Sequence, residues 1–294
     1  IAQEFGHERV KDSPISEAAM VASGIGAGMY GCHPIIDLNF IDFSLGAMDE
    51  IINQAAKIRY MSGGKLKVPL VLRCPVGTAN RGAQHGQSPE SYFIHVPGIK
   101  VVCPSDAYVA KGIIKSAIRD DDPVLVFEHK LLYGSKGRES AGGMDLTAEV
   151  PEEEYLFPIG KALKKRNGTS LTIISTHLTL YRCLAAAEEL AAEGIDCEVI
   201  DPVSLLPLDT ETIYESVNKT KKALIAHEDT FTGGWGAEVA ALISQNCFYD
   251  LKAPVQRIAA YDVPLPVTPV LEQSVVPSVE RIKEKIRQLH KMGK

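Results

Sequence analysis

Glu17 lies in the segment SPISEAAM, where a single carboxylate is surrounded by small and apolar residues. Pro14 and Ile15 predict an extended approach and Ser16 is a candidate N-cap, so Glu17 is expected in the first turn of a helix. The helix dipole alone favours a carboxylate there. Burial among apolar neighbours would instead raise its pKa and let it share a proton with a ligand. The residue types leave both interpretations open.

His85 is the second candidate for chemistry. It lies in a long, glycine-rich polar segment, Gly77–Phe93, with the sequence GTANRGAQHGQSPESYF. Such loops at the carboxyl ends of parallel strands bind ligands, and their glycines let the backbone approach another group closely. Histidine also changes protonation near neutral pH. The segment therefore predicts a site histidine, with a merely solvated loop residue as the alternative.

A formal GxGxxG pattern is formed by Gly26, Gly28 and Gly31. A dinucleotide site needs a strand just before this pattern, and the preceding SEAAMVAS is a helix-forming stretch instead. Small residues at i, i+4 spacing (Ala18, Ala22, Gly26) favour close packing of this helix against another helix. We therefore reject a nucleotide site here.

A histidine and two acidic residues at 227–229 end a predicted strand, and TFTGGWGAE follows them. The turn resembles a phosphate-binding loop but lacks the Lys-Ser/Thr pair of a P-loop. We interpret it as a tight strand-to-helix turn that helps to form an interface. The sequence contains no Gly-x-Ser-x-Gly elbow, HExxH motif or EF-hand loop.

Short apolar runs alternate with stretches of helical period in both halves of the chain. The predicted strands of the first half are 34–40, 68–73, 99–103 and 124–127, with helices over 44–60, 89–95 and 107–119. The second half predicts strands 171–175, 196–200, 223–227 and 255–260, with helices over 178–193, 209–218, 235–246 and 279–292. Apolar strands separated by amphipathic helices indicate α/β domains with doubly wound parallel sheets.

The chain is predicted to contain two domains, 1–135 and 159–294, joined by a connection over 136–158 that is rich in Gly, Ser and Glu. The first half begins with Ile1 and goes directly into a helix. We therefore expect that a leading β-α element is missing from its N-terminus.

The composition is that of an ordinary globular chain of 294 residues, 45% hydrophobic and 23% charged. A net charge of −6 argues against nucleic acid or an anionic membrane as the main partner. No apolar run reaches the ~20 residues that cross a bilayer. The six cysteines are scattered, as expected for reduced thiols inside a cell.

Several long segments, taken in order, resemble one family. They include SPISEAAMVASGIGAGMYGCHPI, GAQHGQSPESYFIHVPGIKVVCPSDAYVAKGIIKSAIRDDDPV, FEHKLLYG and TGGWGAEVAA. The family is that of the beta subunits of thiamine-diphosphate-dependent 2-oxo acid dehydrogenases, which act on pyruvate, branched-chain 2-oxo acids or acetoin. The resemblance covers essentially the whole chain. It implies a pyrimidine-binding thiamine-diphosphate fold followed by a transketolase C-terminal-like domain.

The resemblance also implies roles for four residues. Glu17 matches the glutamate that meets the aminopyrimidine nitrogen of thiamine diphosphate, where a shared proton activates the cofactor. Phe43 and Ile15 match positions that line the same pocket. His85 matches the loop histidine linked to acyl transfer onto a lipoyl arm. Gly86 replaces the serine that many members have, and we expect this glycine to loosen the loop.

The absence of one motif from the sequence indicates a partner subunit. The Mg²⁺ that holds the cofactor diphosphate normally binds a GDG segment, and this sequence has none. The resemblance therefore implies an alpha subunit that holds Mg²⁺ and the diphosphate, in an α2β2 heterotetramer. It further implies that the second domain supports the β–β contact and docks a lipoyl acyltransferase core.

Some family members also hold a structural potassium ion through backbone carbonyls. The matching positions are Leu70, Ala117, Asp120 and Asp122. The alternative is a helix end followed by a solvated acidic turn.

The expected function is decarboxylation of a small 2-oxo acid with transfer of the acyl group to a lipoyl acyltransferase. The expected location is the cytoplasm of a bacterium or archaeon, or the mitochondrial matrix. An acetoin dehydrogenase beta subunit, the C-terminal half of a transketolase-type enzyme and a non-catalytic assembly subunit remain as alternatives.

Overall fold

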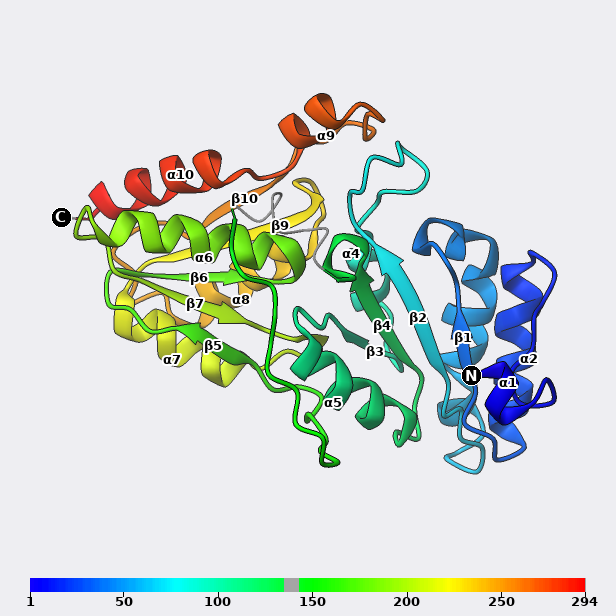
Figure 1. Cartoon of the computed structure of the whole chain (residues 1–294). Coiled ribbons are helices and arrows are strands. Elements are labelled where there is room, and N and C mark those ends of the chain that lie inside the picture. Colours follow the sequence, from blue (N-terminus) through cyan, green and yellow to red (C-terminus); the bar gives the residue numbers. More distant parts are fainter. Residues whose placement is uncertain (135–142, 294) are drawn as a thin grey trace.

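Two five-stranded sheets, each covered by helices, lie side by side in the fold (Figure 1). The structure is a computed structural model that describes residues 1–134 and 143–293. The first part of the predicted connection, 136–142, lies outside the described residues. Its remainder, 143–158, forms neither helix nor strand. No helix in the described ranges is both long enough and apolar enough to cross a membrane.

The first sheet has the strand order β1-β2-β4-β3-β8, and its first four strands run parallel. The strands are β1 (Ile35–Asp37), β2 (Val71–Val76), β4 (Val124–His129), β3 (Lys100–Val102) and β8 (Ser204–Leu206). All residues of β4 and nearly all of β2 are buried. This burial is expected of parallel strands that are covered on both faces.

Helices of three kinds surround the first sheet. They are α1 (Ala2–Phe5), α2 (Glu17–Met29), α3 (Ile58–Met61), α4 (Glu90–Ile94), α5 (Ala107–Ile118), the 3-10 helices η1 (Ile41–Ala47) and η3 (Lys130–Leu132), and the π-helix η2 (Glu50–Ala55). The single helix predicted over 44–60 is therefore wrong, since three helical geometries share this stretch. The wide π-turn places Ile51 and Ala55 against the core, where each is at most 1% exposed.

The second sheet has the strand order β10-β9-β6-β7-β5. Its strands are β10 (Gln256–Ala260), β9 (Ala223–Thr230), β6 (Leu171–Ser175), β7 (Cys197–Asp201) and β5 (Leu163–Arg166), and its helices are α6 (His177–Ala191), α7 (Thr210–Thr220), α8 (Trp235–Asn246), α9 (Pro269–Val275) and α10 (Val279–Lys291). Helices α6 and α10 pack on one face, whereas α7 and α8 pack on the other. The predicted α/β class is confirmed, with an antiparallel strand added at one edge of each sheet.

Those two antiparallel strands were not predicted. β5 has the sequence LKKR, which lacks the apolar run from which strands were predicted. Its three cations are typical of a sheet edge. β8 has only three residues, and prolines lie close to both of its ends, at Pro202 and Pro207. It pairs with β3, with Val102 opposite Ser204 and Val101 opposite Leu206. A segment from the second half of the chain thus completes the first sheet.

Small residues of α2 pack on the sheet, and the predicted stripe is wrong at Ala22 and Gly26, whereas Ala18 packs against the core. Gly24 and Gly28 are the buried ones. A Cβ at Gly24 would lie 3.0 Å from both Ile36 and Leu70, so the glycine allows the helix to approach the strands closely. Ala22 is exposed, and a Cβ added at Gly26 would meet no neighbouring element within 4 Å.

Polar contacts of α6 join the two sheets. The His177 backbone N–H donates to the Ser105 hydroxyl at 3.0 Å, and the Tyr181 hydroxyl donates to the Ser105 carbonyl at 2.8 Å. His177 Nε2 also donates to the Phe127 carbonyl at 2.9 Å. Burial, and then the neighbouring His129, lower the pKa of His177 to about 3, so the ring is neutral near pH 7. These buried bonds tie the first residues of α6 to the first domain.

We expect the two domains to unfold together because they share β8 and these bonds. Tyr181→Phe removes one buried hydrogen bond and should lower the free energy of unfolding by about 1 kcal/mol. The measurement is urea unfolding, followed both by circular dichroism and by fluorescence of Trp235, the only tryptophan. The control is Tyr214→Phe, whose hydroxyl accepts one exposed bond from Asn246. Two separate transitions in the unmodified protein would contradict this expectation.

Candidate active site

The predicted loop histidine lies in the segment that follows β2. We call residues 77–87 the His85 loop. The loop closes on itself, because the Gly77 N–H donates to the Gln87 carbonyl at 3.0 Å. β2 and β4 are adjacent and parallel, so the residues that follow both strands meet at the same edge of the sheet. In Figure 1 this loop rises from the arrowhead of β2 beside α9.

Three rings meet at His85. The rings of Phe43 and His85 have centroids 5.1 Å apart and are nearly perpendicular. The Phe40 ring contacts the same imidazole edge-on, at 4.9 Å. His85 is half-buried, and neither of its ring nitrogens has a hydrogen-bond partner among the described residues. The imidazole is therefore fixed by aromatic contacts while its nitrogens stay available for proton transfer.

Lys130, just after β4, holds the His85 backbone. Its ammonium group donates to the His85 carbonyl at 2.9 Å and lies 5.4 Å from the centroid of the Phe40 ring. Burial lowers the pKa of Lys130 to about 8, although Asp42 and other carboxylates oppose the shift. A cation thus lies next to the aromatic cluster.

Asp42 ties η1 to the base of the loop. Its Oδ1 accepts the Gln87 backbone N–H at 3.2 Å and the Gln87 side-chain amide at 2.8 Å. Its Oδ2 is buried and has no hydrogen-bond partner within the described ranges. Because Phe43 is the next residue, this contact fixes the aromatic ring relative to the loop.

Glu17 is the first residue of α2, and α2 packs against η1, which carries Phe43. Ser16 occupies the N-cap position but makes no side-chain capping bond. The Glu17 carboxylate is half-buried and has no hydrogen bond or ion pair with any described residue. The side chain of Ile15 is 96% exposed and that of Phe43 is 39% exposed. An unpaired carboxylate and an open aromatic face on two packed elements can bind a flat heteroaromatic ring.

Phe40, Asp42 and Lys130 were not predicted to belong to this site. Phe40 was placed at the end of a strand, although the strand ends at Asp37. Lys130 was part of the FEHKLLYG resemblance without a role. Its place directly after a buried strand was the signal that could have identified it, since adjacent parallel strands end at the same edge.

The predicted potassium positions lie together at the opposite side of the first sheet. The Leu70 carbonyl accepts the Val124 N–H at 2.9 Å, and the Ala117 carbonyl accepts the Asp120 N–H at 3.2 Å. The carboxylate of Asp120 bonds Lys100 at 2.6 Å, and that of Asp122 pairs with Arg59.

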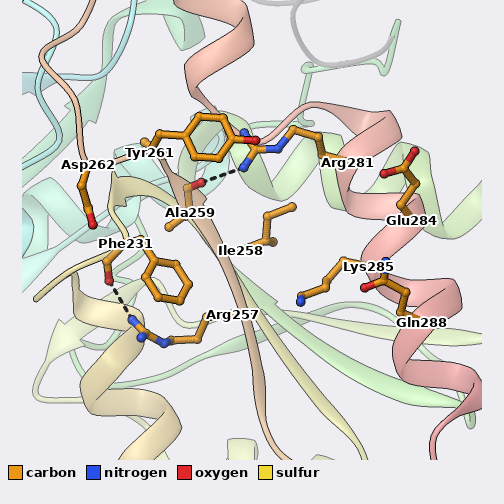
Figure 2. A pocket seen from close by; sticks show the side chains of 11 residues that line it. Phe231, Arg257, Ile258, Ala259, Tyr261, Asp262, Arg281, Glu284, Lys285 and Gln288 are labelled. Carbon is orange, nitrogen blue, oxygen red and sulfur yellow. Dashed lines mark hydrogen bonds between the residues drawn. The ribbon is translucent and has the colours of Figure 1, made fainter.

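A separate cavity of about 490 Å³ lies on the second domain, between β10 and α10 (Figure 2). Arg257 lies over the Phe231 ring, 4.1 Å from its centroid, and donates to the Phe231 carbonyl. Arg281 lies in the same way over Tyr261 and donates to the Ala259 carbonyl. The protein itself therefore holds both guanidinium groups, and none of the predicted site residues lines this cavity.

Gly77 permits the tight start of the His85 loop. Its φ is +87°, a left-handed value that favours glycine. A Cβ at this position would collide with Nε2 of the buried His129 ring. The Gly77 backbone thus lies directly on the His129 imidazole, and the direction in which the His85 loop leaves β2 depends on this contact.

Two family models match the chain. The model described as "Transketolase, pyrimidine binding domain" matches residues 2–136, and "Transketolase, C-terminal domain" matches residues 160–282. Among solved structures, "Split gene transketolase, inactive beta4 tetramer" superposes with a TM-score of 0.79, covering 100% of this chain and 87% of the other. Its sequence is 24% identical, so this likeness shows the fold alone.

Curated relatives are similar over nearly the whole chain. The 2-oxoisovalerate dehydrogenase subunit beta of Bacillus subtilis is 43% identical, with 98% of this chain and 85% of the relative aligned. The acetoin:2,6-dichlorophenolindophenol oxidoreductase subunit beta of Cupriavidus necator is 41% identical over 98% and 82%. The pyruvate dehydrogenase E1 component subunit beta of Rickettsia felis is 39% identical over 98% and 86%.

We expect Gly77→Ala to destabilise the protein by about 3 kcal/mol, because it combines left-handed backbone strain with a collision against a buried ring. Gly63→Ala is the matched control, with φ +64° and no atom within 4 Å of the added Cβ. It should cost only about 1 kcal/mol. Urea unfolding followed by Trp235 fluorescence measures both variants. Equal losses would show that the contact with His129 has no energetic role.

Proposed function

Because the chain belongs to the family of 2-oxo acid dehydrogenase beta subunits, we propose that it is the beta subunit of a thiamine-diphosphate-dependent 2-oxo acid dehydrogenase. The observation that carries this proposal is the site itself. An unpaired carboxylate, an open aromatic face and an available imidazole lie on adjoining elements at one side of the first domain.

The residues present fit the pyrimidine end of the cofactor. We propose that Glu17 holds a proton against the pyrimidine nitrogen, since no described residue competes for its carboxylate. The ring of Phe43 would pack on the pyrimidine, with Ile15 at the side of the pocket. When bound, thiamine diphosphate supplies a carbon nucleophile and an electron sink.

The overall reaction transfers the acyl group of the substrate to a lipoyl group, and the atoms and electrons balance between these two reactants. The bond between the 2-oxo carbon and the carboxylate breaks, and carbon dioxide leaves. The lipoyl disulfide accepts two electrons as its S–S bond breaks; one sulfur forms the acyl thioester and the other takes a proton. We propose that the imidazole of His85 supplies this proton, because its ring nitrogens have no other partner within the described ranges.

The exposure of these residues supports a site shared with another polypeptide. Ile15 and Phe43 present apolar surface to solvent in the isolated chain, and apolar surface at a binding site is normally covered. We propose an alpha subunit that covers it and holds Mg²⁺ and the diphosphate, in an α2β2 assembly. The second domain would then support the β–β contact and dock the lipoyl acyltransferase.

Two substrate classes deserve a direct comparison. The relatives include subunits named for pyruvate and for 2-oxoisovalerate, and also for acetoin, at nearly equal identity. We propose a 2-oxo acid as the substrate and acetoin as the second candidate. The proposed compartment is the bacterial or archaeal cytoplasm or the mitochondrial matrix, since the relatives include bacterial and mitochondrial proteins.

We also propose that Leu70, Ala117, Asp120 and Asp122 hold a potassium ion. In support, hydrogen bonds bring Ala117, Asp120 and Asp122 into one turn, and the Leu70 carbonyl accepts the Val124 N–H just after that turn. The Asp122 N–H donates to Asp120 Oδ1 at 2.9 Å, and the Asp120 N–H donates to the Ala117 carbonyl. Oxygen ligands from carbonyls and carboxylates suit such a hard cation.

We expect Glu17→Gln to lower kcat for decarboxylation at least ~100-fold, because the amide cannot share its proton in the same way. The assay uses the chain reconstituted with its alpha subunit, Mg²⁺ and thiamine diphosphate. Pyruvate, 3-methyl-2-oxobutanoate and acetoin are tested with dichlorophenolindophenol as electron acceptor. The control is Glu8→Gln, an exposed carboxylate. Near-full activity of the Glu17 variant, or turnover by the isolated chain, would contradict the proposed shared site.

Potassium should raise the melting temperature relative to choline at equal ionic strength. Binding at ten times Kd stabilises a protein by about 1.4 kcal/mol, which corresponds to roughly 2–4 °C for a chain of this size. Thermal unfolding in potassium, sodium and choline chlorides measures the effect. Identical melting temperatures in potassium and choline would exclude a structural potassium ion.

A further inference from the structure

Carboxylates of the second domain hold the backbone of the His85 loop. The loop emerges from the first sheet, but two of its amides bond to side chains on β9 and α9. Among the described residues, these carboxylates, Glu228 and Glu272, have no hydrogen bond to the imidazole of His85. They lie about 150 and 190 residues after the loop in the sequence, in the second domain. Each contact is therefore a link between domains.

Glu228 is the inner of the two links. Its Oε1 accepts the Thr78 N–H at 2.5 Å, and both of its oxygens lie 3.3 Å from His129 Nε2. Arg182 lies 3.9 Å away on its other side. Burial by itself would raise the pKa of Glu228, but His129, Arg182 and the Thr78 amide more than offset it and lower the pKa to about 2. The group is therefore a fixed negative charge near pH 7.

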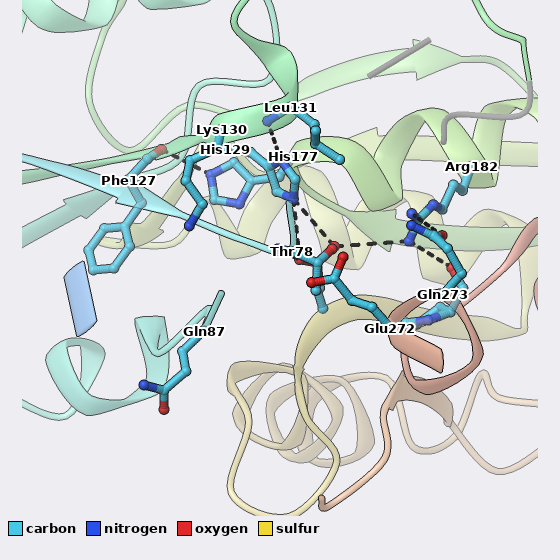
Figure 3. Close-up of polar contacts among 12 residues, drawn as sticks. Thr78, Gln87, Phe127, His129, Lys130, Leu131, His177, Arg182, Glu272 and Gln273 are labelled. Atoms are coloured by element: carbon cyan, nitrogen blue, oxygen red, sulfur yellow. Dashed lines mark hydrogen bonds and ion pairs between the residues drawn. The ribbon is translucent and has the colours of Figure 1, made fainter. Parts of the chain in front are cut away.

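Glu272 is the outer link and is fully buried. Both of its carboxylate oxygens accept the Asn80 N–H, at 2.8 and 3.1 Å. Arg182 connects this helix with the inner link, because it donates to the Gln273 side chain at 3.2 Å and to the Pro277 carbonyl at 3.0 Å. The two carboxylates thus belong to one network, in which Arg182 contacts Glu228 and also Gln273, the residue next to Glu272 (Figure 3).

Packing supports the same arrangement. A Cβ added at Gly86 would lie 3.0 Å from Leu265 Cδ1 and 3.1 Å from the Gly82 carbonyl. Gly82 in turn faces Val267 of the same second-domain segment. We expected Gly86 to loosen the loop. Its missing side chain also has the opposite effect, because it lets the loop pack closely on the second domain. His85 lies between two contacts, its carbonyl held by Lys130 and its neighbour Gly86 against Leu265.

We propose that Glu228 and Glu272 are positioning residues which set the place of His85 for acyl transfer. The proposal rests on the proposed function, in which His85 acts only after decarboxylation. The loop amides are held at Thr78 and Asn80, so loss of either link loosens the segment that carries the imidazole. Decarboxylation depends on Glu17, which lies on α2 outside the loop, and on Phe43, whose ring contacts His85 but whose backbone belongs to η1. The two half-reactions should therefore respond differently.

The test compares Glu272→Met with Glu272→Gln in the reconstituted α2β2 enzyme. Met fills similar space but accepts no hydrogen bond from Asn80, whereas Gln keeps one acceptor oxygen. Two rates are measured: decarboxylation with dichlorophenolindophenol, and acylation of a free lipoyl domain. We expect the Met variant to lose at least ~10-fold in lipoyl acylation, since small displacements of a catalytic group are costly. Its decarboxylation should stay within about threefold of wild type, and the Gln variant should recover most of the acylation.

Glu198→Gln is the matched control. Glu198 is also a fully buried carboxylate of the second domain, and it accepts a backbone N–H from Gly168 at 3.3 Å. It has no contact with the His85 loop, so both half-reactions should be unchanged. Trp235 fluorescence checks that each variant is folded. His85→Ala provides the benchmark for complete loss of the proposed acyl-transfer role.

Hydrogen exchange of the 77–87 amides tests the link without using activity. Exchange in this segment should rise at least ~10-fold in Glu272→Met and stay near the wild-type rate in Glu272→Gln. Unchanged exchange, or equal loss of both half-reactions, would overturn the positioning role. If His85→Ala retained lipoyl acylation, the role of His85 in the proposed function would fail instead, and the exchange result would still decide whether the carboxylates hold the loop.

Discussion

Buried charges lie at the interface between the two domains, beside an apolar core that the domains share, and the need to pair these charges constrains the whole molecule. Arg182 is 1% exposed, so its guanidinium must find partners inside the protein, and it finds them on β9, on α9 and in the segment before α10. Removing one partner of such a group leaves an uncompensated charge, which costs several kcal/mol. The positions of the side chains at this interface are therefore narrowly fixed. The bonds from the Thr78 and Asn80 amides fix the His85 loop relative to them.

Much of the fold follows from local sequence patterns. The strand over Leu171–Ser175 and the helix over Trp235–Asn246 have the predicted bounds, because apolar period and flanking glycines agree there. Very short elements were not predicted from these local patterns. β8 is too short to show a period, and it is a strand only because β3 offers an unpaired edge from the other domain. Tertiary pairing, which local pattern does not encode, creates such elements.

The candidate site divides in the same way. Residue type and loop composition drew attention to Glu17 and His85, and the family resemblance supplied their roles. Lys130 and the second-domain carboxylates were not recognised as loop contacts, since their importance lies in which backbone groups they reach. A carboxylate such as Glu272, in the segment VLEQS, has no distinguishing neighbours. Only the path of the folded chain brings it to the Asn80 amide.

The shared strand also limits how this polypeptide can be divided. The segment 143–158 has the composition of a linker, and a designer of shorter proteins would cut there. A fragment ending at that point would lack β8, leaving the outer side of β3 without its hydrogen-bonding neighbour. Bare strand edges recruit other chains and promote aggregation. Expression of the pyrimidine-binding half as a separate protein would therefore require a graft of residues 204–206 or a redesigned edge.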